Sequence, residues 1–228
     1  MARSGAPTAG RVTKEWAAEF PDFDVWKPLR LLRRIGPVVQ GVCLDRTTGG
    51  DGYLPTAHVH ALTREFPVVS LTLGRRLTRP SGTPDPVLFA RHERDFGRAT
   101  GALREQSALP LDEPPSIEAI VREYHAEARR RVEKGHGPAV PEVEDGILVA
   151  AAAGQHDLAE EGLSLARELT GVWPRSSMPL DWPGAEAWLD GLVARAGDRE
   201  ALVAVVRGQT VAHKLARVRD RFPWDCRL

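Results

Sequence analysis

The chain has 228 residues, of which 42% are hydrophobic and 27% charged, and its 31 Lys and Arg residues balance 31 Asp and Glu residues. A chain of this length and composition can bury a core, and its zero net charge shows neither the basic balance that suggests a nucleic-acid surface nor the acidic balance that suggests a solvating tail. Two cysteines, neither in a CxxC pair, exclude a disulfide framework.

The first ten residues lack the apolar stretch of a secretory signal, and no run approaches the roughly 18 apolar residues that span a bilayer. We therefore expect a cytoplasmic protein without membrane insertion. Only four of the Lys and Arg residues are lysine, and asparagine is absent, which indicates a GC-rich and bacterial genome.

The N-terminal part is expected to begin with a disordered tail over residues 1–10, because these residues are small and polar. Apolar spacing predicts a short helix over residues 12–20, with Thr13 as its cap, and a second over residues 29–35.

Three β-rich runs follow, at residues 38–44, 56–62 and 68–73, and the cluster TTGGDG separates the first two. They predict a three-stranded antiparallel meander in the N-terminal third. Alternation along each run places Val39, Cys43 and Val59 on an apolar face and Gln40, His58 and His60 on a polar face.

Residues 78–86, TRPSGTPDP, form the clearest break in composition, and helical periodicity dominates after them. Helices are predicted over residues 87–107 and 117–134, the latter capped by Ser116. Two αα-hairpins follow, over residues 142–153 with 156–170 and over residues 184–195 with 199–221. The fold class is therefore α+β, with a sheet-containing part at residues 11–80 and a helical part at residues 81–228, as two units or one continuous domain.

The polar sheet face is the candidate site, formed by Gln40, His58, His60, Ser70 and Thr72. Two histidines two positions apart on a strand point to one side, about 7 Å apart, and can supply two imidazoles to a metal. A third ligand would come from Asp45, Asp51, His92 or Asp95, and the spacing selects none of them. Alternatively, the histidines form hydrogen bonds with Ser70 and Thr72 on the next strand.

Other patterns are less specific. No cofactor motif is present, the Gly49–Gly52 cluster lacks the following helix and lysine of a phosphate loop, and Cys43 is expected to be buried. The basic residues of the last predicted helix favour a solvated face over a nucleic-acid surface.

The six tryptophans lie mostly in loops beside prolines, where they either pin irregular segments to the core or mark a partner surface. The leading hypothesis is a non-enzymatic binding protein that engages another protein, in an immunity-like, antitoxin-like or operon accessory role. It requires an exposed apolar patch containing a loop tryptophan. The alternative is a small, metal-assisted enzyme with its site around His58 and His60.

Overall fold

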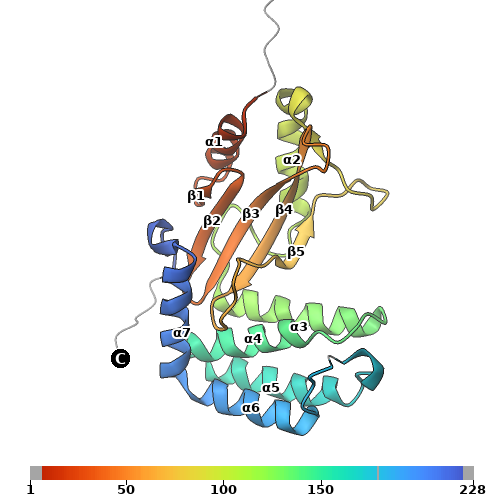
Figure 1. Ribbon diagram of the computed structural model, residues 1–228, viewed down its shortest axis with the longest axis vertical. Coiled ribbons are helices and arrows are strands. Elements are labelled where there is room, and N and C mark those ends of the chain that lie inside the picture. Colours follow the sequence, from red (N-terminus) through yellow and green to blue (C-terminus); the bar gives the residue numbers. More distant parts are fainter. Residues whose placement is uncertain (1–6, 179, 223–228) are drawn as a thin grey trace, which may run out of the picture.

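The structure, a computed structural model, describes residues 7–178 and 180–222 and joins one antiparallel sheet to a layer of helices (Figure 1). The strands lie in the order β1-β2-β3-β4-β5, and the short β6 pairs with β4. Their bounds are β1 Asp24–Lys27, β2 Arg30–Ile35, β3 Val38–Arg46, β4 Gly52–Ala61, β5 Thr72–Arg76 and β6 Val87–Leu88.

The described residues also form seven α-helices, so the α+β class is confirmed. Their bounds are α1 Ala9–Glu19, α2 His92–Gln106, α3 Ile117–Glu133, α4 Val140–Ala152, α5 His156–Thr170, α6 Ala185–Gly197 and α7 Arg199–Ala212. Short 3-10 turns occupy Phe89–Arg91, Arg175–Ser177 and Leu215–Arg217.

The prediction of a helix over residues 29–35 is wrong, because these residues form β2. Gly36, at a φ of 56°, and Pro37 make a tight turn that places Val38 opposite Ile35. All six residues of β2 then pair with β3. Sheet hydrogen bonds to a strongly β-forming neighbour therefore override a short helical pattern of apolar residues.

β3, β4 and β5 form an antiparallel meander, but only its first hairpin, β3 with β4, matches the predicted runs. The third strand begins at Thr72 rather than at residue 68, and β1 and β2 extend the sheet on the other side. Leu73, at a φ of 50°, lies where the pairing of β4 with β5 shifts register.

Both faces of the sheet are covered, which explains why nearly every residue of β3 and β4 is buried. On the first face, α1 and α2 pack over Leu31, Val42 and Leu44. Farther along that face, a larger cluster joins Ile35, Val38 and Val59 of the sheet to residues of α3, α4, α5 and α6. On the second face, α7 and the turn after it pack over Trp26, Leu32 and Val39.

The helical part follows the sequence pattern in most places. Ser116 caps α3, accepting a hydrogen bond from the Ala119 amide, and α4 and α5 form the first predicted hairpin. The second predicted hairpin, over residues 184–195 and 199–221, differs from the structure in two ways. α7 ends at Ala212, and it turns away from α6 to lie along the sheet (Figure 1).

The N-terminal expectations need two corrections. α1 begins at Ala9, within the predicted tail, and residues 1–6 lie outside the described residues. Thr8 is the cap, at 3.2 Å from the Arg11 amide. The hydroxyl of Thr13 instead bonds to the Ala9 carbonyl and to the Leu29 amide, which ties α1 to the sheet.

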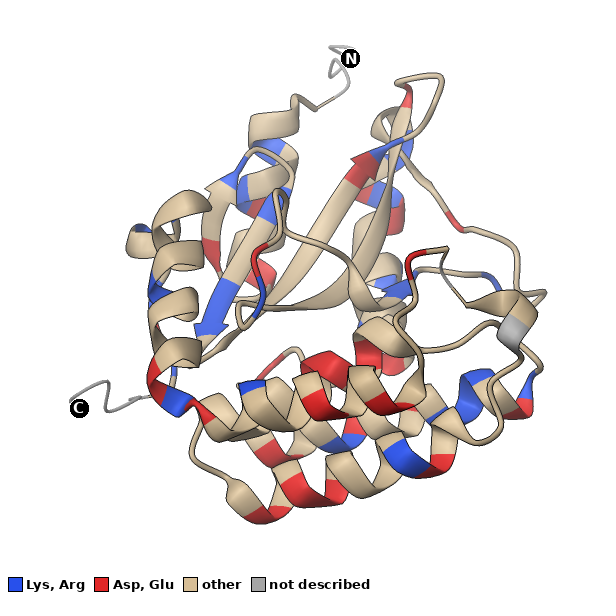
Figure 2. Ribbon diagram, turned by 60° about the horizontal axis from the view of Figure 1, so that its bottom comes forward, with Lys and Arg blue, Asp and Glu red and all other residues tan. Residues whose placement is uncertain are grey.

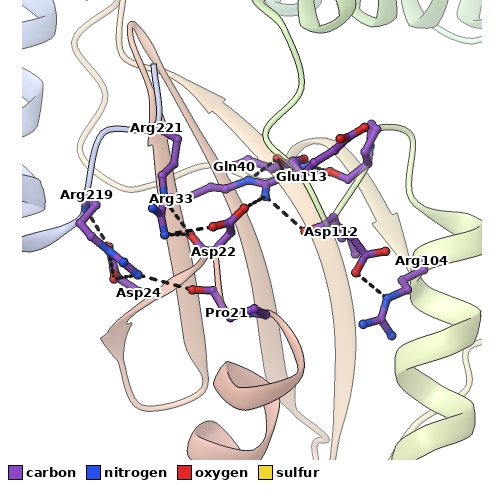
Figure 3. Close-up of polar contacts among 12 residues, drawn as sticks. Pro21, Asp22, Asp24, Arg33, Gln40, Arg104, Asp112, Glu113, Arg219 and Arg221 are labelled. Atoms are coloured by element: carbon purple, nitrogen blue, oxygen red, sulfur yellow. Dashed lines mark hydrogen bonds and ion pairs between the residues drawn. The ribbon is translucent and has the colours of Figure 1, made fainter. Parts of the chain in front are cut away.

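The segment after α7 returns to the start of the sheet (Figure 3). The backbone of Arg34 in β2 bonds to Arg219 and Arg221, beyond the end of β1. Arg219 pairs with Asp24 at 2.8 Å, and Arg221 pairs with Asp22 at 3.2 Å. This segment therefore joins the helical part to the first strands of the sheet.

Candidate functional site

His58 and His60 lie on β4 and share the second sheet face with their partners on β3, Gly41 and Val39. Only 3% and 2% of their surfaces are exposed. The His58 ring occupies space that Gly41 leaves free, since a Cβ at position 41 would lie 2.3 Å from His58 Nε2. Burial lowers the pKa of His58 to about 4 and the pKa of His60 to about 3, so both imidazoles are neutral at pH 7.

Residues 62–71, which we call the strap, connect β4 to β5 and are held by His60. The Ser70 amide lies 3.1 Å from His60 Nδ1, and the Ser70 hydroxyl lies 2.8 Å from the same atom. Because a backbone amide only donates, Nδ1 accepts and the proton of the neutral ring is on Nε2. The Ser70 hydroxyl also bonds to Thr72, so three of the expected site residues form one hydrogen-bonded chain.

Two further contacts hold the strap. The Phe66 amide donates to Gln209 of α7 at 3.1 Å, and the same oxygen lies 3.1 Å from Nε2 of His213. Arg64 pairs with the buried Asp145 of α4 at 2.8 Å. The polar side chains on this face therefore fasten a segment of the chain over the sheet.

The placement of Gln40 beside the two histidines is wrong. Gln40 pairs with Val59 across the sheet and lies on the first face, because residues directly opposite on antiparallel strands share a face. Its amide oxygen accepts two hydrogen bonds from Arg33, at 2.9 and 2.7 Å (Figure 3).

Arg33 is fully buried and binds the segment before α3 to the sheet. Besides Gln40, it donates to the carbonyl oxygens of Pro110 and Leu111, at 2.8 and 3.2 Å. Burial lowers the pKa of Arg33 to about 10, and Asp22, at 4.0 Å, partly opposes that shift. This cluster connects β2 and β3 to the segment before α3.

Within residues 7–178 and 180–222, no third ligand is brought to the two histidines. In the described ranges, no three His, Cys, Asp or Glu side chains are arranged to hold a metal ion. The four residues considered as a third ligand have other partners: Asp45 pairs with Arg30, Asp51 bonds to Thr47, Asp95 pairs with Arg94, and His92 bonds to Tyr53 and Glu15.

A different site lies at the loop between α5 and α6. Trp173, Trp182 and Trp188 form one aromatic cluster there, with ring centroids 5.3 to 6.3 Å apart. Trp188 is anchored by donating to Glu144 of α4 at 2.7 Å. Packing of this kind adds to simple burial of aromatic area, and it gives the loop a rigid base.

Beside this cluster is a pocket of about 550 Å³ at the end of α5 and the start of α6. Its walls are Thr170, Gly171, Trp173, Met178, Trp182, Gly184 and Ala185. The same loop carries two exposed apolar side chains, Val172 at 60% exposure and Leu180, which is fully exposed. The loop thus combines an aromatic pocket with apolar side chains in water.

A groove of about 700 Å³ runs between α3 and α5. The α5 wall presents Asp157, Glu160, Glu161, Ser164 and Glu168, and the α3 wall presents Arg122, His125 and Arg129. The groove reaches Glu168, near the end of α5. Two residues later, Thr170 lines the pocket beside the tryptophan cluster, which we call the tryptophan pocket, so the groove and the pocket lie next to each other.

No family model, curated protein sequence or solved structure matches the chain. No helix of the described part is long and apolar enough to cross a membrane.

The sequence indicated this loop only through its tryptophans. Trp173, Trp182 and Trp188 were visible as aromatic residues near prolines, but their convergence depends on α6 folding back against α4 and α5. A sequence pattern does not report that contact.

Proposed function

We propose that the chain is a cytoplasmic bacterial protein that binds another protein, and that it holds an apolar side chain of its partner in the tryptophan pocket. The observation that carries this proposal is the pocket itself. It is within the roughly 300–1,000 Å³ of typical binding pockets, and Val172 and Leu180 extend its apolar surface into water.

The residue types support a protein partner. Tryptophan is enriched at the energetic centres of protein interfaces, where it supplies a large contact area with few rotatable bonds. Leu180 has no neighbours that cover it, so its exposure is unfavourable in water and is relieved when a partner covers it. An immunity-like, antitoxin-like or operon accessory role is consistent with such a surface.

The enzyme alternative has weaker support. His58 and His60 are buried under the strap, and Nδ1 of His60 is already engaged by Ser70. A catalytic pair would instead need to face a space that a substrate can enter.

The test uses random peptides displayed on phage and selected on the full chain, followed by fluorescence titration of one enriched synthetic peptide. Because Trp173 and Trp182 line the pocket, we expect binding to change the tryptophan emission. The double variant Val172→Ser with Leu180→Ser should bind about tenfold to a hundredfold more weakly, since it removes roughly 1–3 kcal/mol of apolar contact.

The matched control is Val68→Ser with Val211→Ser, which makes the same kind of change at two exposed valines away from the pocket, at 58% and 76% exposure. This variant should bind like the wild type. Equal loss in both variants, or no enriched peptide at all, would contradict the proposal.

A further inference from the structure

The charge of the chain is unevenly distributed around the tryptophan pocket. Between His156 and Leu192 the sequence contains seven Asp and Glu residues and two arginines, a net charge of −5 in a chain whose total is zero. Figure 2 shows acidic segments recurring along the helices of this layer. The pocket therefore lies in an acidic part of a protein that is neutral overall.

The acidic side chains of α5 form a stripe along the groove. Asp157, Glu160, Glu161 and Glu168 recur at helical spacing, all four are exposed, and the stripe runs toward the pocket end of the helix. Asp181 and Glu186, which are exposed as well, flank the pocket walls in sequence.

Few positive charges among the described residues offset these carboxylates. Among the side chains that the structure describes, none of the seven is in an ion pair, while other acidic residues are paired with arginines, such as Glu123 and Glu127 with Arg130. On the opposite wall, Arg122 is already paired with Glu118, which leaves Arg129 as the arginine that faces the stripe, so this wall offsets the four carboxylates only in part.

From these observations we infer that the partner segment is rich in lysine and arginine, lies along the α5 stripe, and inserts an apolar residue into the tryptophan pocket. This inference rests on the proposed function and adds the chemistry of the partner. Complementary charge accelerates association and selects among partners, and the indole faces beside the pocket also favour a cation. A nucleic acid or an anionic membrane would be repelled by the same carboxylates.

The experiment compares three displayed peptide libraries that share one fixed aromatic residue. The flanking positions are drawn from neutral residues with Lys and Arg, from neutral residues alone, or from neutral residues with Asp and Glu. We expect the basic library to give peptides that bind about tenfold more tightly than the best neutral ones, and no binder from the acidic library. Binding of the basic peptides should weaken roughly tenfold when salt is raised from about 0.05 M to about 0.5 M.

The decisive variant is Glu160→Lys with Glu161→Lys, which should weaken the basic peptides about tenfold and leave the neutral peptides unchanged. Its matched control is Glu65→Lys with Glu105→Lys, which changes the total charge equally at two exposed positions away from the groove. Circular dichroism confirms that each variant is folded.

The outcomes separate the two proposals. If neutral and basic peptides bind equally and the groove reversal has no effect, the inference about charge is overturned while binding at the pocket stands. If both reversals weaken binding equally, only total charge matters and the α5 stripe is not the contact. If no aromatic peptide binds from any library, both proposals are wrong.

Discussion

At the scale of single residues, the histidines of the second sheet face make stability depend on pH. The pKa of histidine in an unfolded chain is about 6.5, whereas burial lowers the pKa of His58 to about 4. Above pH 6.5 neither state is protonated. As the pH falls below 6.5, the unfolded chain binds a proton that the folded protein does not, so the free energy of unfolding decreases until the pH reaches the folded pKa.

We therefore expect the free energy of unfolding to fall less steeply between pH 6.5 and 5 in His58→Gln than in the wild type. The difference in slope should be about 1.4 kcal/mol per pH unit. Urea unfolding at a series of pH values measures it. Asp145, whose pKa burial raises to about 6, acts in the opposite direction but contributes equally to both proteins.

The control is His136→Gln, because His136 is exposed. Its slope should match that of the wild type. Parallel curves for His58→Gln and the wild type would show that burial does not lower the pKa of His58.

The sequence predicted part of the histidine site at this scale. The bond between His60 and Ser70 follows from the strand pattern, because a polar residue on the next segment was expected beside it. The position of Gln40 did not follow, since the relative phase of β3 and β4 depends on where the turn between them begins. A one-residue error in that turn moves every side chain to the other face.

At the scale of elements, two glycines in helices have opposite consequences. Gly162 of α5 lies where α5 meets its neighbours, and an added Cβ would be 2.6 Å from Ile147 Cγ1 and 3.0 Å from His125 Nε2. Gly208 of α7 has open space at the same position. Close helix packing therefore explains why residue 162 is glycine, but it does not explain the glycine at position 208.

Gly162→Ala should lower the free energy of unfolding by about 1–3 kcal/mol, because the crowded Cβ forces the helices apart. Gly208→Ala should raise it by about 0.5–1 kcal/mol, because alanine has the higher helix propensity. Urea unfolding of the two variants beside the wild type measures both changes. A stabilised Gly162→Ala would mean that α4 and α5 are less closely packed than the structure shows.

Helices were predicted better than strands for a physical reason. The periodicity of α5 is local, and the structure reproduces its predicted bounds, residues 156–170. β2 has an apolar pattern that suits either state, and its pairing partner β3 decides the outcome. The direction of α7 could not be predicted from the sequence. Only Asp198 separates α7 from α6, and tertiary contacts determine the angle between two helices joined by so short a connection.

At the scale of the whole molecule, the largest hydrophobic cluster crosses the composition break between the sheet and the helices. Ile35, Val38 and Val59 of the sheet share it with Ile147 of α4 and Leu165 of α5. Separate domains would each enclose their own core, whereas here one core belongs to both parts.

We expect the two parts to unfold in one cooperative transition. Near-ultraviolet circular dichroism, which reports tryptophans in both parts, and far-ultraviolet circular dichroism should give the same midpoint in urea. Two separated midpoints would show that the sheet and the helical layer are independent units.

The cover of the second sheet face has a consequence for biosynthesis. Trp26 donates to the carbonyl of His213 at 3.0 Å, across 187 positions of the chain. The ribosome therefore completes all strands of the sheet and the helices α3 to α6 before α7 and the turn after it, which complete the cover of this face, emerge. Thr56, His58 and His60, rather than three aliphatic residues, line β4 on that face, so we expect the growing chain to expose less apolar surface there before α7 is made.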